Sequence, residues 1–134
     1  MKFSVTRLIH FCYGHRLLNY SGKCRNLHGH NGLIEITIEG KKLDRLGMVM
    51  DFEEIKSKVQ TWVDRELDHK MILNRRDPIL SDMRKHGQPC VTIDGNPTAE
   101  SIAKLIYDYA KSKRLPVSSV KLWETRNSYA QFGE

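Results

Sequence analysis

The chain has 134 residues, 40% of them hydrophobic and 28% charged, which fits a single globular domain over residues 1–134 with its own core. No apolar run is long enough to span a membrane and the first residues lack the apolar stretch of a secretory signal, so we expect a cytoplasmic protein with no membrane partner. The formal net charge of +6 favours an anionic partner, either a nucleic acid or a phosphorylated small molecule, although the basic residues are scattered.

The N-terminal part of the chain alternates as strands do. Apolar residues favour odd positions between residues 2 and 15, and His15 keeps the same parity, which predicts a strand with His15 on its inner face. Turn-forming residues fill 19–26. A second strand is predicted over 32–39, because Ile34, Ile36 and Ile38 alternate with polar residues there.

Two helices are predicted in the middle of the chain. Asp51 and Glu54 have the spacing of a capping box at the start of a helix over 51–67. Its apolar stripe is predicted at Phe52, Ile55, Val59 and Trp62. Thr98 can cap the second helix. The inward side chains of that helix are predicted to be Ile102, Leu105, Ile106 and Tyr109.

The remaining segments complete a β-β-α-α-β-β order. Residues 74–96 are predicted to be mostly irregular, with a short apolar piece at 90–93. Two short strands are predicted at 119–125 and 128–132. This order indicates an α+β domain with a mostly antiparallel sheet and two helices on one face.

The most informative pattern is the segment Cys24-Arg-Asn-Leu-His28-Gly-His30. Residues two apart in an extended segment point the same way, so His28 and His30 can present nitrogens to one ion. His15, at the end of the preceding strand, can supply the third. Three imidazoles with one open position are typical of catalytic zinc, so the pattern predicts a Zn²⁺ site, with a fortuitous His-x-His pair as the alternative. His10 has the opposite parity and is expected to face solvent.

Three cysteines at wide spacing form no disulfide framework. Cys24 has two possible roles beside the metal. It can be a fourth ligand that closes a structural site, or a reactive thiol whose thiolate is favoured by the metal and by Lys23 and Arg25. The residues alone leave both roles open. Cys12 and Cys90 are expected to be packing residues.

Three further polar residues are candidates for chemistry. Asp68 and His69 are adjacent, and they form either an acid–base relay or a polar pair that ends a helix. Glu124 shares the parity of two apolar residues in its strand. It is therefore either an exposed strand end or a buried carboxylate with a dedicated partner, suited to the two N–H groups of a guanidine-like heterocycle.

Six motifs along the chain resemble, in type and in order, those of the family of 6-pyruvoyl tetrahydropterin synthases and 6-carboxy-tetrahydropterin synthases. This family has the tunnelling fold (T-fold). They cover almost the whole chain and are specific in combination, although several are weak singly. They are Phe11-Cys-Tyr-Gly-His15-Arg, Cys24-x3-His28-Gly-His30-Asn31, Gly47-Met-Val-Met-Asp51-Phe52, Leu67-Asp68-His69, Asn96-Pro97-Thr98-Ala99-Glu100 and Trp123-Glu124-Thr125.

The resemblance implies a role for each motif residue. Zinc would be held by His15, His28 and His30. Cys24 would be the proton acceptor rather than a ligand, and Asp68 with His69 would be its relay. Glu124 would anchor the pterin ring, and Thr98 and Glu100 would lie in or near the pterin pocket. The chain departs from the family at two positions: Gly32 stands where an aromatic residue is common, and Tyr13 where a small one is usual.

The three residues between Cys24 and His28 resemble the carboxy branch of the family. That branch implies a lyase of the queuosine (7-deazaguanine) pathway. It would convert 7,8-dihydroneopterin triphosphate to 6-carboxy-5,6,7,8-tetrahydropterin with release of acetaldehyde and triphosphate. The first alternative is a 6-pyruvoyl tetrahydropterin synthase.

A third alternative, from another class, is a basic nucleic-acid-binding module with a structural zinc. Scattered lysines and an aromatic content of 8% argue against it, so no nucleic-acid partner is expected. The family resemblance also implies a homo-oligomer, a hexamer built as a dimer of trimers, with active sites between subunits.

Overall fold

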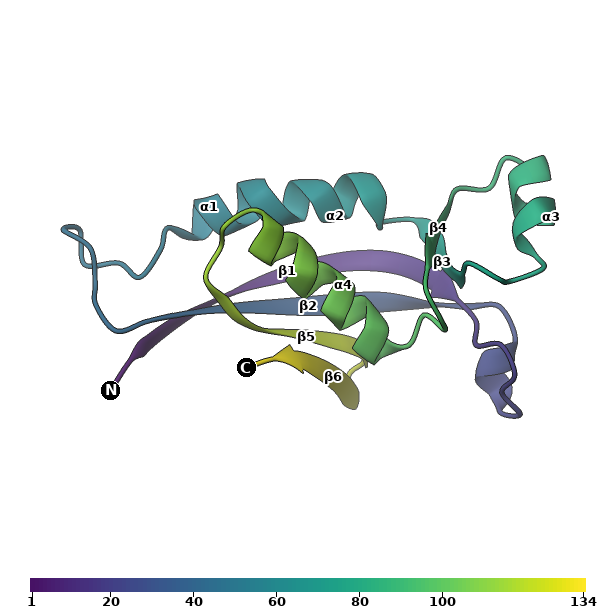
Figure 1. Ribbon diagram of the computed structural model, residues 1–134, viewed down its shortest axis with the longest axis horizontal. Coiled ribbons are helices and arrows are strands. Elements are labelled where there is room, and N and C mark those ends of the chain that lie inside the picture. Colours follow the sequence, from purple (N-terminus) through teal and green to yellow (C-terminus); the bar gives the residue numbers. More distant parts are fainter.

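The fold is built on a long twisted sheet with helices on one of its faces (Figure 1). The computed structural model describes residues 1–134. Six strands lie in the order β4-β3-β1-β2-β5-β6. Their bounds are β1 (Phe3–His15), β2 (His28–Gly40), β3 (Lys70–Asn74), β4 (Cys90–Ile93), β5 (Val117–Thr125) and β6 (Ser128–Gly133).

The β1–β2 hairpin is the longest pairing, and its register brings two of the candidate ligands together. Antiparallel pairing sets His15 opposite His28 and Tyr13 opposite His30. The odd-numbered side chains of β1 from Ile9 onward are buried, and His10 is exposed. The parity predicted from the sequence is therefore confirmed, because side chains two apart share one face of a strand.

The predicted α+β class is confirmed, and the sheet is mostly antiparallel, with two parallel pairings among five. Strands β1, β2, β5 and β6 pair antiparallel, as predicted. β3 pairs parallel to β1, and β4 pairs parallel to β3. The prediction of an irregular 74–96 missed β4 as a sheet strand and the short helix α3 (Leu80–Lys85). Parallel partners are far apart in sequence and leave no hairpin turn to signal them.

The first predicted helix is one segment of three parts, α1 (Phe52–Ile55), the π-helical turn η2 (Lys56–Gln60) and α2 (Thr61–Glu66). Asp51 caps it, and its side chain accepts a hydrogen bond from the backbone N–H of Glu53. Glu54 pairs with Lys58 instead of returning to Asp51, so only one half of the predicted capping box forms.

The buried stripe of this segment differs from the predicted one. Its fully buried residues follow a spacing of four, while Phe52 is 48% exposed. Residues four apart drift by about 40° in an ideal α-helix, and the wider π-turn corrects that drift. The buried residues are Ile55, Val59, Val63 and Leu67.

The second predicted helix is α4 (Ala99–Ser112), and Thr98 caps it as predicted by accepting from the backbone N–H of Ser101. Leu105 and Tyr109, which were predicted to face inward, are only partly buried. The Tyr109 ring stacks on Trp62 at a centroid distance of 4.0 Å, which joins α4 to α2. The inner face of α4 consists of Ile102, Ala103, Ile106, Tyr107 and Ala110.

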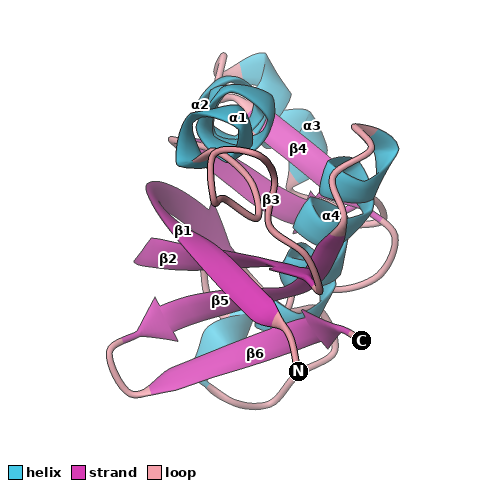
Figure 2. Cartoon of the chain, turned by 90° about the vertical axis from the view of Figure 1, so that its left-hand side faces the viewer, coloured by secondary structure: helices cyan, strands magenta, loops and turns pink.

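The core lies between these helices and the sheet, and Figure 2 shows β1, β2, β5 and β6 one after another below α1 and α2. No helix of the structure has both the length and the apolar character needed to cross a membrane. Beyond β1, Arg16 forms a two-bond ion pair with buried Asp77, which ties the chain after His15 to the turn before α3. The hydrogen bond from Arg16 lowers the pKa of Asp77, so the pair is charged at neutral pH.

Candidate metal centre and active site

Three histidine side chains converge where β1 ends and β2 begins. One nitrogen from each of His15, His28 and His30 lies within 4.8 Å of the other two. The Nε2 atoms of His15 and His30 are 3.1 Å apart. The hairpin register explains this meeting, because it sets His15 opposite His28, with His30 two residues further on the same face.

Backbone carbonyls orient two of the three imidazoles. Nδ1 of His15 lies 2.7 Å from the carbonyl oxygen of Pro97, and Nδ1 of His28 lies 2.7 Å from that of Asn26. A carbonyl oxygen only accepts, so each Nδ1 carries the proton and donates. The Nε2 atoms of both rings therefore present lone pairs to the centre of the site. Histidines that bind metals commonly donate their other ring N–H to a carbonyl or carboxylate in this way.

The donor set fits a metal ion. Nε2 of His28 is buried and has no hydrogen-bond partner, which a cation at the centre would supply. Nitrogens bound at about 2.0–2.1 Å with tetrahedral angles lie about 3.4 Å apart, close to the separation of His15 and His30. Burial lowers the pKa of both His15 and His30 by more than the charge of Glu124 and the hydrogen bond to Pro97 raise it. Both rings are therefore neutral at pH 7, the form in which imidazole can bind a metal ion.

Glu124 of β5 stands beside the histidines. Its Oε1 is 3.9 Å from Nε2 of His15, and its Oε2 is 3.9 Å from Nε2 of His30. The side chain is 28% exposed, so it is neither an exposed strand end nor a sealed core carboxylate. Its parity with Leu122, which is fully buried, placed it correctly on the inner face.

Asp68 and His69 form a hydrogen-bonded pair at the edge of the same site. Nδ1 of His69 lies 2.7 Å from Oδ2 of Asp68, and the other carboxylate oxygen accepts from the backbone N–H of Cys12 at 2.8 Å. Burial opposes ionisation of Asp68, but these hydrogen bonds outweigh it and the pKa of Asp68 is lowered. The carboxylate is therefore charged and holds the proton of His69 on Nδ1.

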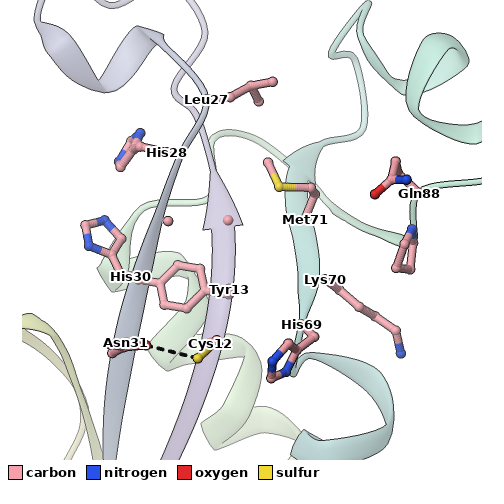
Figure 3. A pocket seen from close by; sticks show the side chains of 13 residues that line it. Cys12, Tyr13, Leu27, His28, His30, Asn31, His69, Lys70, Met71 and Gln88 are labelled. Carbon is pink, nitrogen blue, oxygen red and sulfur yellow. Dashed lines mark hydrogen bonds between the residues drawn. The ribbon is translucent and has the colours of Figure 1, made fainter. Parts of the chain in front are cut away.

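A cavity of about 580 Å³ connects the pair to the histidines. Its lining includes His28, His30 and His69, and Figure 3 shows them on either side of Tyr13. His69 has a φ of +59°, a left-handed conformation that histidine adopts more readily than most residues. Its backbone N–H donates to the carbonyl of Cys12 at 2.7 Å, and its imidazole is 78% exposed at the rim.

Comparison with known proteins decides the family. Residues 4–134 match the 6-pyruvoyl tetrahydropterin synthase family. The chain belongs to this family. A relative from Rickettsia bellii, named 6-carboxy-5,6,7,8-tetrahydropterin synthase, is 39% identical over 94% of this chain and 96% of its own length. One of the same name from Aquifex aeolicus is 31% identical over 100% and 99%.

Solved structures agree with the fold of this pterin synthase family. An uncharacterised protein from Wolinella succinogenes superposes with a TM-score of 0.83 at 25% identity, over 100% of this chain and 99% of its own. The 6-pyruvoyl tetrahydropterin synthase of Caenorhabditis elegans gives a TM-score of 0.74 at 21% identity, over 100% and 96%, and at that identity it supports the fold alone.

Cys24, the predicted proton acceptor, makes no hydrogen bond to Asp68 or His69 within one chain. It belongs to the 3-10 turn η1 (Lys23–Arg25), is half-buried, and does not line the cavity that His69 lines. Cys12 lines that cavity instead, and its thiol donates to Oδ1 of Asn31 at 3.0 Å (Figure 3). The predicted relay between His69 and Cys24 stays a prediction.

The segment 96–100, which was predicted to line the pterin pocket, reaches the histidine triad through its backbone. The Thr98 hydroxyl is engaged with Ser101 in capping α4, and Glu100 is exposed. Pro97 supplies the carbonyl that orients His15. The roles predicted for Thr98 and Glu100 in the pterin pocket are not tested by these contacts.

The sequence analysis did not identify the two carbonyls that orient His15 and His28, and it did not place the Tyr13 side chain in the site. Any residue has a carbonyl, so Pro97 and Asn26 gave no signal. Tyr13 did give a signal, because it shares the inward parity of His15 and lies opposite the candidate ligand His30.

Proposed function

We propose that the chain is a zinc-dependent 6-carboxy-5,6,7,8-tetrahydropterin synthase. In this role it is a lyase that acts on 7,8-dihydroneopterin triphosphate and releases acetaldehyde and triphosphate, as a step of the queuosine pathway. The observation that carries the proposal is the triad of imidazoles, each with one ring nitrogen facing a common point, with Glu124 beside it. Relatives that carry this enzyme's name over nearly the whole chain support the reaction type.

Zinc is the metal that this donor set favours. Three neutral imidazoles with a fourth position left open are typical of catalytic zinc centres. Bound there by His15, His28 and His30, Zn²⁺ would supply a Lewis acid that polarises the oxygens of the substrate's side chain. The chain's part is to keep His15 and His30 neutral, which burial does, and to orient His15 and His28, which the two carbonyls do.

Proton transfer falls to Cys24 with Asp68 and His69. The Asp68 carboxylate holds the proton on Nδ1 of His69, which leaves Nε2 of that ring free to exchange a proton. Cys24 would remove the proton from the substrate's side chain as the thiolate. Since Cys24 lies outside the cavity lined by His69 of its own chain, we infer that the two meet between subunits of a homo-oligomer, proposed to be a dimer of trimers.

Glu124 would anchor the pterin ring. Its two oxygens can accept the adjacent N–H groups of the ring's guanidine-like edge, a pair of charge-assisted hydrogen bonds. Holding the ring there would place the substrate's side chain at the metal, where proximity lowers the barrier. The 3.9 Å distances to His15 and His30 also allow a second role for Glu124, as a metal ligand.

Glu124→Gln is expected to separate these two roles. Charge-assisted hydrogen bonds contribute roughly 1.5–3 kcal/mol each, so the zinc-loaded variant should bind neopterin at least about tenfold more weakly in calorimetric titration. Zinc content should not change. Glu66→Gln, on the exposed surface of α2, is the matched control and should bind as the wild type does. Loss of zinc in Glu124→Gln would show that Glu124 is a ligand, and unchanged affinity would show that the ring is held elsewhere.

The reaction itself is tested by product analysis. Incubating the zinc-loaded protein with 7,8-dihydroneopterin triphosphate is expected to yield 6-carboxy-5,6,7,8-tetrahydropterin and equal amounts of acetaldehyde and triphosphate. Metal-depleted protein should form none of them. Triphosphate release with a 6-pyruvoyl product and no acetaldehyde would assign the chain to the pyruvoyl branch instead.

A further inference from the structure

Tyr13 places a buried hydroxyl in the metal centre. The residue is 3% exposed, and its hydroxyl oxygen is buried without a hydrogen-bond partner. Its ring centroid lies 5.2 Å from that of His15 and 5.5 Å from that of His30, and Figure 3 shows the ring next to His30. Among the buried side-chain nitrogen and oxygen atoms, only this hydroxyl and Nε2 of His28 have no hydrogen-bond partner, and both belong to the same site.

The space for this ring comes from Gly32 on the neighbouring strand. Gly32 pairs with Phe11, and the Phe11 and Tyr13 rings stack at a centroid distance of 4.9 Å. A Cβ atom added at Gly32 would lie 2.8 Å from the Phe11 ring and 3.0 Å from the Tyr13 ring. Gly32 therefore leaves room for the aromatic ring of Tyr13 on β1, and the hydroxyl of this ring lies in the site.

The hydroxyl is costly unless it acquires a partner. A buried hydroxyl without a hydrogen bond destabilises a fold, whereas phenylalanine would fill the same space without that cost. The Glu124 carboxylate lies beside the same two imidazoles, His15 and His30, that the Tyr13 ring packs against. A tyrosine hydroxyl is protonated at neutral pH, so Tyr13 can donate a hydrogen bond to a carboxylate.

We propose that the Tyr13 hydroxyl donates a hydrogen bond to Glu124 in the loaded site and so positions that carboxylate for the pterin. The inference rests on the proposed role of Glu124. Glu124 could bind either the metal or the pterin ring, because its oxygens are 3.9 Å from Nε2 of His15 and of His30, where the metal would bind. A donor on the protein side holds the carboxylate away from the metal and directs it to the ring. Tyr13 is a positioning residue in this scheme.

The test is a double-mutant cycle between Tyr13→Phe and Glu124→Gln, read as neopterin affinity by calorimetric titration of the zinc-loaded proteins. Tyr13→Phe keeps the ring and its packing, so zinc content should stay at the wild-type level. It is expected to weaken neopterin binding about three- to tenfold. In the Glu124→Gln background the same change should have almost no further effect, because the carboxylate it positions is gone. Tyr20→Phe, an exposed tyrosine outside the site, is the control.

A second readout follows the metal directly. In the cobalt-substituted protein, the visible spectrum of Tyr13→Phe should shift if Glu124 moves onto the ion, and Tyr13→Phe/Glu124→Gln should abolish that shift. If the wild type binds neopterin and Tyr13→Phe binds it equally well, the inference is wrong but the proposed function stands. The same holds if the losses of affinity in the double variant are fully additive. No neopterin binding by the wild type would overturn the proposed function, and this inference with it.

Discussion

Replacing His28 and His30 together by alanine is expected to strip the protein of zinc, from one ion per chain to about a tenth of that or less. His15 would be the sole remaining ligand of the triad, and one imidazole does not hold zinc through dialysis. Metal analysis of the purified variant measures the loss, and turnover of the pterin substrate should disappear with the metal.

The matched control is His10→Ala, which lies on β1 with the opposite parity and is exposed. It should keep its zinc. His28 and His30 are only partly buried, so circular dichroism of the double variant should resemble that of the wild type. Full zinc retention in the double variant would contradict the site as drawn.

Cys24→Ala is expected to reduce turnover by at least about 10²-fold while zinc stays bound, because general acid–base catalysis typically contributes 10²–10⁴-fold. The substitution removes the thiol and leaves the three histidines in place. Steady-state kinetics together with metal analysis of the same preparation separates the two effects.

Two other cysteines calibrate this result. Cys90→Ala, in β4 and outside the cavity, should leave turnover unchanged. Cys12→Ala is the informative competitor, since Cys12 lines the cavity together with His69. Loss of zinc from Cys24→Ala would make Cys24 a fourth ligand. Loss of turnover in Cys12→Ala but not in Cys24→Ala would move the acid–base role to Cys12.

The hairpin shows how far local pattern reaches. A period of two over β1 predicted that His15 shares the inner face with Ile9 and Phe11, and the His-x-His spacing predicted that His28 and His30 point the same way. These statements depend only on the geometry of an extended chain, which neighbouring residues encode. Register completed the triad, and it follows from which faces are apolar.

Local pattern was less reliable where the backbone departs from the ideal. The helical stripe was predicted to begin at Phe52, which is exposed, because a π-turn re-phases the segment around Val59. β3 and β4 were missed because each is short and pairs with a strand parallel to it. Neither feature leaves a mark on a short stretch of sequence.

The sequence by itself determined the fold family, the three candidate metal ligands and the inward parity of Glu124, since each depends on spacing within one element or on motifs in chain order. Only the tertiary structure decided which atoms face the centre. The Pro97 carbonyl that orients His15 lies 82 residues away, and Glu124 reaches the triad from another strand. Contacts between such distant residues arise from packing of the sheet against its helices, which no local period encodes.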